Sequence, residues 1–108
     1  METKQSTLHV YEAGTLTVAG FNGHDVLEHV NIAEVRSELL ELITEHNCET
    51  LAIDFTGVKL IPSGLLGLLA SLRQQGVDVH LYNPSDDIRE VMEITNLHKV
   101  MPMYEVEL

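Results

Sequence analysis

Hydrophobic and polar positions alternate in two short runs near the start of the chain. Leu8 and Val10 alternate with polar neighbours in the first run, and Leu16 and Val18 do so in the second. A period of two predicts strands, and Gly14 between the runs predicts a turn. The sequence FNGHDVLEHV that follows contains an Asn-Gly pair and is predicted to form a loop.

A period near 3.6 replaces the alternation from residue 31 onward and predicts an amphipathic helix. Asn31 can cap this helix, and Glu34 stands where a capping box has its second member. We expect the helix to end near Asn47. Its inner face is predicted to consist of Ile32, Val35, Leu39, Leu42 and Ile43.

Two more helices are predicted further along the chain. The leucine-rich segment from Ser63 to about Gln75 stops at Gly76, which suits the left-handed conformation after a helix. The other begins after Ser85, a favoured cap, and ends near Asn96. Its predicted inner face consists of Ile88, Val91, Met92 and Thr95.

Apolar strands alternate with these helices. TLAIDFTGV has Leu51, Ile53 and Phe55 on one side, and its apolar character predicts a central position in a sheet. VDVHLYN is another alternating strand, and VMPMYEV predicts a last short strand that Pro102 confines to a sheet edge. The order β-β-α-β-α-β-α-β predicts one α/β domain over residues 1–108, with a mixed sheet and packed helices.

The charge of the chain favours some partners over others. Six Lys and Arg against seventeen Asp and Glu give a net charge of −11. A field of this sign repels nucleic acids, and it would speed the approach of a basic protein partner. The same charge also keeps a protein soluble without any partner. We therefore expect no nucleic-acid binding.

Cysteine and histidine usage argues against a disulfide framework and against a metal site. Cys48 is the only cysteine, which fits a reducing compartment. The start METKQSTLHV lacks the apolar core of a secretion signal, and the longest apolar stretch, residues 60–72, is too short to span a bilayer. The group Glu45, His46 and Cys48 lacks the four convergent ligands of a structural zinc site. We expect a cytoplasmic protein without membrane association, cofactor or metal.

The segment KLIPSGLLGLLASL places a serine between an apolar run and the leucine-rich helix. Ser63 is thereby predicted at a helix N-terminus, where backbone N–H groups lack partners within the helix. Two interpretations are open. The side chain of Ser63 caps the helix, or its hydroxyl faces a partner or kinase and can carry a phosphate that those N–H groups would bind.

Residues 51–105 resemble the STAS domain, the fold of anti-sigma factor antagonists. In that family an apolar strand ends in Asp-φ-(Ser/Thr)-Gly-Val, where φ is an apolar residue, and DFTGV at residues 54–58 matches. A turn φ-φ-Asp-Ser-(Ser/Thr)-Gly-Leu-Gly then opens a leucine-rich helix, and LIPSGLLG at residues 60–67 occupies its place. A strand, an Asn-Pro-Ser helix start and a final strand follow. The front half matches in element order and in LTVAG.

This resemblance implies a non-catalytic regulatory module that binds an anti-sigma factor or a related kinase or switch protein. The serine that an anti-sigma kinase phosphorylates in the family, to release the partner, falls on Ser63. The family aspartate falls on Pro62, the following Ser/Thr on Gly64, and the glycine on Leu65. Ser63 is therefore the candidate phosphoacceptor, and the expected partner surface consists of Pro62, Ser63, Gly64 and Leu65.

The altered residues leave a second interpretation open. Pro62 supplies neither a carboxylate nor a backbone N–H beside the serine. A divergent STAS module could bind a small ligand, a nucleotide or a lipid, or act as a scaffold without phosphorylation. The chain has no Gly-rich phosphate loop. Asp54 is expected to be structural, satisfied by backbone donors, and no set of residues predicts catalysis.

Overall fold

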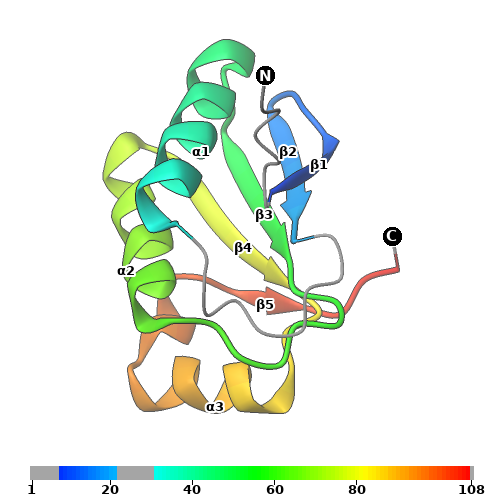
Figure 1. Cartoon of the computed structure of the whole chain (residues 1–108), viewed down its shortest axis with the longest axis vertical. Coiled ribbons are helices and arrows are strands. Elements are labelled where there is room, and N and C mark those ends of the chain that lie inside the picture. Colours follow the sequence, from blue (N-terminus) through cyan, green and yellow to red (C-terminus); the bar gives the residue numbers. More distant parts are fainter. Residues whose placement is uncertain (1–7, 22–30, 108) are drawn as a thin grey trace, which may run out of the picture.

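The computed structural model describes residues 8–21 and 31–107 (Figure 1). The predicted loop with Asn22 and Gly23, and the histidines His24 and His29, lie outside the described residues. The element order within the described ranges agrees with the predicted one. The elements are β1 (His9–Glu12), β2 (Leu16–Gly20), α1 (Ile32–His46), β3 (Thr50–Asp54), α2 (Ser63–Leu72), η1 (Arg73–Gln75), β4 (Asp78–Tyr82), α3 (Asp86–Ile94), η2 (Leu97–Lys99) and β5 (Met103–Tyr104).

In the described part of the chain the strands form one sheet in the order β1-β2-β3-β4-β5. β1 pairs with β2 antiparallel, and the other neighbours pair in parallel. The predictions of a mixed sheet and of a central TLAID strand are therefore confirmed. β5 lies at one edge, as Pro102 predicts, and its segment still accepts a hydrogen bond at Pro102 O from Leu81 N–H (2.9 Å).

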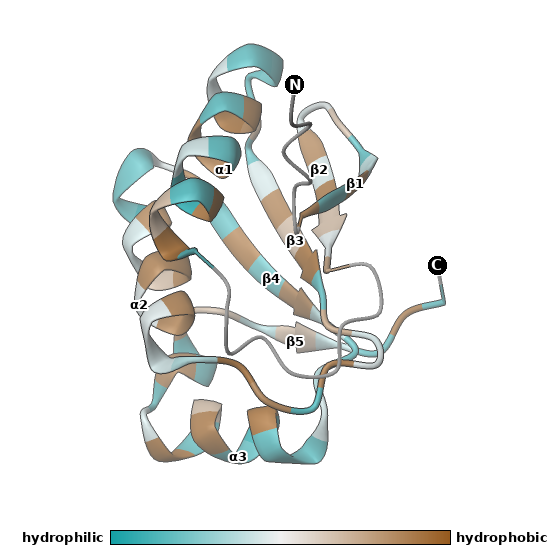
Figure 2. Ribbon diagram, viewed as in Figure 1, coloured by the Kyte–Doolittle hydropathy of each residue, from teal (hydrophilic) through white to brown (hydrophobic). Residues whose placement is uncertain are grey.

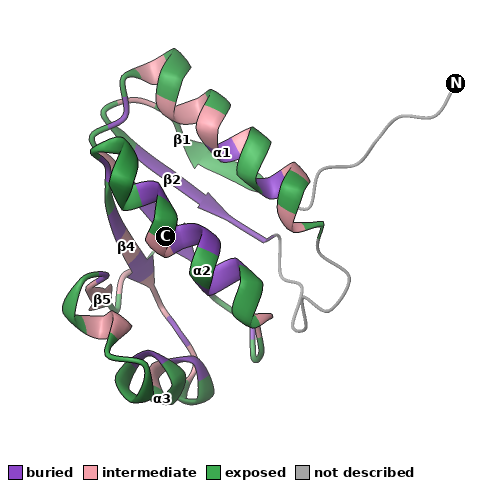
Figure 3. Ribbon diagram, turned by 90° about the vertical axis from the view of Figure 1, so that its left-hand side faces the viewer, coloured by how far each residue is buried: buried purple, intermediate pink, exposed green. Residues whose placement is uncertain are grey.

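The helices α1 and α2 lie side by side on one face of the sheet (Figure 3). Leu51, Ile53 and Phe55 point to this face and are fully buried. Ala52 and Asp54 alternate with them and point to the other face. The main core therefore lies between the sheet and the two helices, and the brown stripes of Figure 2 follow it.

The first helix begins and ends as its sequence predicts. The Asn31 side chain accepts a hydrogen bond from Glu34 N–H (3.1 Å), and such a cap stabilises a helix by about 1 kcal/mol. Asn47 has a left-handed conformation (φ 50°) and its N–H bonds to Ile43 O. Val35 and Leu39 are buried in the core. Ile32, Leu42 and Ile43 are partly buried and pack against it.

The other helices differ from the prediction in part. The helix over residues 63–75 is α-helical only to Leu72 and closes with a 3-10 turn before Gly76, which has φ 84°. In α3, Ile88 and Met92 are buried as predicted. Val91 is 42% exposed and Thr95 is exposed, so their assignment to the inner face is wrong. α3 has only nine residues and packs on the core through Ile88 and Met92, which are four residues apart on one face. Residues outside that face, such as Val91 and Thr95, remain in solvent.

The edge strand β1 also departs from simple alternation. Leu8 is buried, whereas Val10, two residues further on, is 39% exposed. The pairing register with β2 shifts between Val10 and Glu12, which places a bulge at Tyr11. No helix in the described ranges has the length and apolar character needed to cross a membrane.

Candidate functional site

Ser63 is the first residue of α2, and it is exposed. Pro62 occupies the N-cap position in an extended conformation (φ −68°, ψ 145°), and it offers no side-chain cap. The interpretation of Ser63 as the cap is therefore wrong, because a capping residue lies outside the helix in an extended conformation. The prediction of a solvent-exposed hydroxyl at the start of the leucine-rich helix is confirmed.

The residues around Ser63 divide between surface and core. Gly64 is exposed and Pro62 is half-buried, so both reach the surface. Leu65 is fully buried in the core, and burial of a leucine contributes about 2 kcal/mol to folding. The prediction that Leu65 forms part of a partner surface is therefore wrong, because its side chain packs in the core and cannot contact a partner.

The N-terminus of α2 differs electrostatically from that of α3. The first turn of α2 contains no acidic residue, whereas α3 has Ser85 as cap and both Asp86 and Asp87 in its first turn. Backbone N–H groups at the start of a helix carry a partial positive charge, which a nearby carboxylate offsets. The start of α2 thus combines an exposed hydroxyl with the positive end of a helix dipole.

A groove of about 180 Å³ runs between the start of α2 and α3. We call it the α2–α3 groove. Apolar side chains make up most of its lining, and Ser63 lies on it together with one residue of each charge. The lining residues are Lys59, Leu60, Ile61, Ser63, Leu66, Asp87, Ile88 and Val91.

Ser85 forms hydrogen bonds with both sides of the α2–α3 groove. Its hydroxyl donates a hydrogen bond to Lys59 O (3.0 Å) and accepts one from Ile88 N–H (3.2 Å). The same side chain therefore caps α3 and holds the loop that leads to Ser63. The sequence indicated the cap, but it could not indicate the bond to Lys59, which lies 26 residues earlier.

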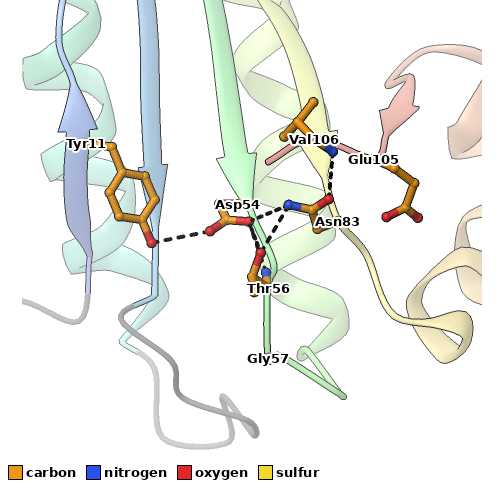
Figure 4. A pocket seen from close by; sticks show the side chains of 7 residues that line it. All are labelled: Tyr11, Asp54, Thr56, Gly57, Asn83, Glu105 and Val106. Atoms are coloured by element: carbon orange, nitrogen blue, oxygen red, sulfur yellow. Dashed lines mark hydrogen bonds between the residues drawn. The ribbon is translucent and has the colours of Figure 1, made fainter. Parts of the chain in front are cut away.

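A polar cluster, separate from the α2–α3 groove, lies at the C-terminal end of β3 and is centred on Asp54 (Figure 4). Asp54 is 5% exposed. Its Oδ1 accepts hydrogen bonds from Thr56 N–H (3.1 Å) and from the Thr56 hydroxyl (2.6 Å). Asn83 Nδ2 donates to Thr56 Oγ1 (3.1 Å) and more weakly to Asp54 Oδ1 (3.4 Å). The sequence predicted backbone donors for Asp54, and Thr56 N–H is one, whereas the other donors among the described residues are side chains.

Tyr11 joins this cluster from the bulge in β1. Its hydroxyl donates to Asp54 Oδ2 (3.3 Å), and burial together with the neighbouring Asp54 carboxylate raises the pKa of the phenol above its usual 10.0. The ring passes close over Gly20, where an added Cβ would lie 2.9 Å from the Tyr11 hydroxyl oxygen. Gly20 is therefore the residue that lets Tyr11 reach Asp54 across β2.

The cluster also holds the C-terminal segment. Asn83 Oδ1 accepts a hydrogen bond from Val106 N–H (2.8 Å), and Arg89 forms an ion pair with Glu105. Asn83, Glu105 and Val106 line an open depression of about 750 Å³ beside Asp54. Because the polar groups bond one another, and no buried side-chain nitrogen or oxygen of the described residues lacks a partner, the arrangement is that of a structural cluster.

Comparison with protein families identifies the fold. The model of the STAS domain matches residues 17–107, which is most of the chain. The chain belongs to the STAS domain family. No curated protein matches the chain.

Solved structures agree with this assignment of the STAS domain. The unphosphorylated anti-sigma factor antagonist SpoIIAA has a TM-score of 0.75 at 18% identity, over 93% of this chain and 88% of that one. An anti-sigma-factor antagonist (STAS) domain protein from Planctomyces limnophilus has a TM-score of 0.75 at 19% identity, over 93% of this chain and 91% of that one. Phosphorylated SpoIIAA, the Bacillus cell fate determinant, has a TM-score of 0.67 at 19% identity, over 93% of this chain and 91% of that one. At these identities the likeness shows the fold.

The STAS domain offers two surfaces near the ends of its parallel strands, the α2–α3 groove with Ser63 and the depression beside Asp54. No group of three or more His, Cys, Asp or Glu side chains in the described ranges could hold a metal ion. Sequence reasoning found Ser63, Pro62 and Gly64 but missed Leu60, Ile61 and Val91. Their exposure or partial exposure depends on where the loop and α3 meet, which no local pattern encodes.

Proposed function

We propose that this STAS domain is a non-catalytic regulatory module that binds an anti-sigma factor or a related kinase or switch protein. The contact surface consists of Pro62, Ser63, Gly64 and the adjoining α2–α3 groove, and phosphorylation of Ser63 controls the contact. The observation that carries the proposal is the exposed Ser63 hydroxyl at the first position of α2, beside an open apolar groove. The family relation supports a regulatory role.

The environment of Ser63 explains how a phosphate would act. A phosphoserine carries about −1.5 to −2 charges, which the N–H groups at the start of α2 favour. A partner whose apolar side chain fills the groove would have to remove water from that phosphate. Phosphorylation should therefore be compatible with the folded domain but should oppose the bound complex.

Pro62 supports an alternative in which the domain binds its partner without phosphorylation. The family aspartate is missing there, and the extended Pro62 offers the Ser63 hydroxyl no side-chain hydrogen-bonding group. Nucleotide or lipid binding stays a prediction of the divergent-module interpretation. Titration with labelled GTP, ATP and a short-chain phospholipid tests it directly, and saturable binding would favour that interpretation.

Affinity capture from the native lysate tests the main proposal. The baits are the wild type, Ser63→Ala, Ser63→Asp and Ser71→Asp, the last a matched control because Ser71 is also exposed on α2. We expect a shared partner that Ser63→Asp alone fails to recover. Equal recovery by all four baits would support the phosphorylation-independent scaffold. Incubation of the domain with the captured partner and ATP, followed by mass spectrometry, should place phosphate on Ser63.

A further inference from the structure

The α2–α3 groove opens onto apolar side chains that the fold leaves in solvent. Leu60 and Val91 line the groove and are 54% and 42% exposed. Ile94 stands about one turn beyond Val91 on α3 and is 72% exposed. These three large aliphatic side chains form an apolar strip that the described residues leave exposed.

The charge around the strip is mostly negative, and Lys59 on the groove lining is the basic exception among the lining residues. α3 exposes four carboxylates, two of which, Asp87 and Glu90, lie beside Val91 and Ile94 on the helix surface, and its basic residue, Arg89, is half-buried and paired with Glu105. The whole chain carries a net charge of −11. An apolar strip with an acidic border is complementary to a partner whose apolar side chains are flanked by Lys and Arg. The exposed carboxylates belong to Asp86, Asp87, Glu90 and Glu93.

The face of α2 next to the groove carries small residues. Ser63 and Gly67 are one turn apart, and both are exposed. Among the described residues, a Cβ added at Gly67 would meet nothing within 4 Å, so their packing does not require glycine there. Glycine in a helix interior costs about 1 kcal/mol relative to alanine. A partner backbone that approaches α2 closely would account for a glycine that the isolated fold does not need.

We propose that the α2–α3 groove and its acidic border receive an amphipathic helix of the partner protein. Apolar side chains at helical spacing cover Leu60, Val91 and Ile94, basic side chains face the carboxylates of α3, and the helix backbone lies over Gly67. Helix-in-groove binding of this kind uses apolar anchors at positions i, i+3, i+4 and i+7. The inference deepens the proposed function and rests on it, because it gives the chemistry of the segment that the Ser63 surface binds.

A defined peptide probe tests this inference on the intact chain. The probe is a fluorescein-labelled helical peptide of about eighteen residues containing only Leu and Lys, with the leucines on one face. A peptide of the same composition with dispersed leucines is the reference. We expect fluorescence anisotropy to show saturable binding of the first peptide, at least about tenfold tighter than the second, and weakened by added NaCl.

Paired variants locate the site of binding. Val91→Gln with Ile94→Gln should weaken binding of the probe about tenfold or more, whereas Val10→Gln with Leu16→Gln, a less exposed apolar pair on β1 and β2, should not. Glu90→Lys should weaken binding more than Glu41→Lys. Both charge reversals alter the net charge equally, and both residues are exposed, so the two variants differ in where the charge is changed.

Two outcomes would overturn the inference. One is equal binding of the probe by the wild type and by the Val91 and Ile94 double variant. The other is sedimentation showing that the wild type self-associates and that this double variant does not, which would assign the strip to a second copy of the chain. The captured partner separates these failures from failure of the proposed function. If that partner discriminates Ser63→Asp but tolerates the Val91 and Ile94 changes, the proposed function stands and the helix-in-groove inference does not.

Discussion

Replacing Asp54 by alanine should remove the centre of the cluster that joins β1, β3 and the segment after β4. Two hydrogen bonds from Thr56 have normal lengths, 3.1 and 2.6 Å, and the contacts from Tyr11 and Asn83 are longer, 3.3 and 3.4 Å. Hydrogen bonds to a charged acceptor contribute about 1.5 to 3 kcal/mol each. The substitution therefore removes roughly 4 kcal/mol from the two shorter bonds alone.

Part of that loss is recovered in the variant. The substitution also removes the cost of keeping a carboxylate 95% out of solvent, and water from the adjoining depression can reach some of the released donors. We expect a net decrease of about 3 kcal/mol in the free energy of unfolding. Asp54→Asn, which keeps the shape and one acceptor oxygen, should lose about 1 kcal/mol.

Urea denaturation followed by circular dichroism measures this difference. With an m value of about 1.5 kcal/mol per molar urea, Asp54→Ala should unfold at a urea concentration about 2 M lower than the wild type. Asp78→Ala, in an exposed residue at the start of β4, is the control and should change stability by less than about 0.5 kcal/mol. If Asp54→Ala were as stable as this control, the cluster would not stabilise the fold, and its assignment as structural would be wrong.

Three further variants test separate features. Ser85→Ala removes the cap of α3 and the hydrogen bond to Lys59 O. It should lower the free energy of unfolding by about 1 to 2 kcal/mol in the same urea assay and should weaken partner binding. An unchanged urea midpoint would contradict the role of Ser85. Gly67→Ala should stabilise the isolated domain by about 0.5 to 1 kcal/mol, and a destabilised variant would show that the fold itself needs this glycine. The phenol of Tyr11 has a raised pKa in the folded state, so above pH 10 it keeps its proton while the unfolded phenol ionises. The contribution of Tyr11 to the free energy of unfolding should therefore fall as pH rises above 10. Tyr11→Phe should therefore lose less stability than the wild type between about pH 9 and 11, and parallel pH curves would rule out this contribution of Tyr11.

Local chemistry made much of the fold predictable. Asn31, Gly76 and Asn96 mark helix boundaries through side-chain capping or left-handed backbone conformations, and the structure has them at those boundaries. The order of elements and the central position of β3 follow from the periodicity of apolar residues. Each of these features depends on a few neighbouring residues, and a sequence pattern can report it.

Features that depend on distant residues were predicted less well. Ser63 was placed correctly at the start of α2, but whether it or Pro62 takes the cap position depends on one residue of helix onset, which patterns do not resolve. The burial of Leu65 and the exposure of Val91 depend on which side of each helix meets the sheet. The reach of Tyr11 to Asp54 needs a bulge in β1 and a glycine in β2, and neither alone predicts the contact.

The regulatory account depends most on what a phosphate at Ser63 does to partner binding. Isothermal titration of the captured partner against the domain, unmodified and phosphorylated at Ser63, measures this effect directly. We expect the unmodified domain to bind and the phosphorylated domain to bind at least about tenfold more weakly, with both forms equally stable in urea. Equal affinity of the two forms would contradict the phosphorylation switch, and tighter binding of the phosphorylated form would reverse it.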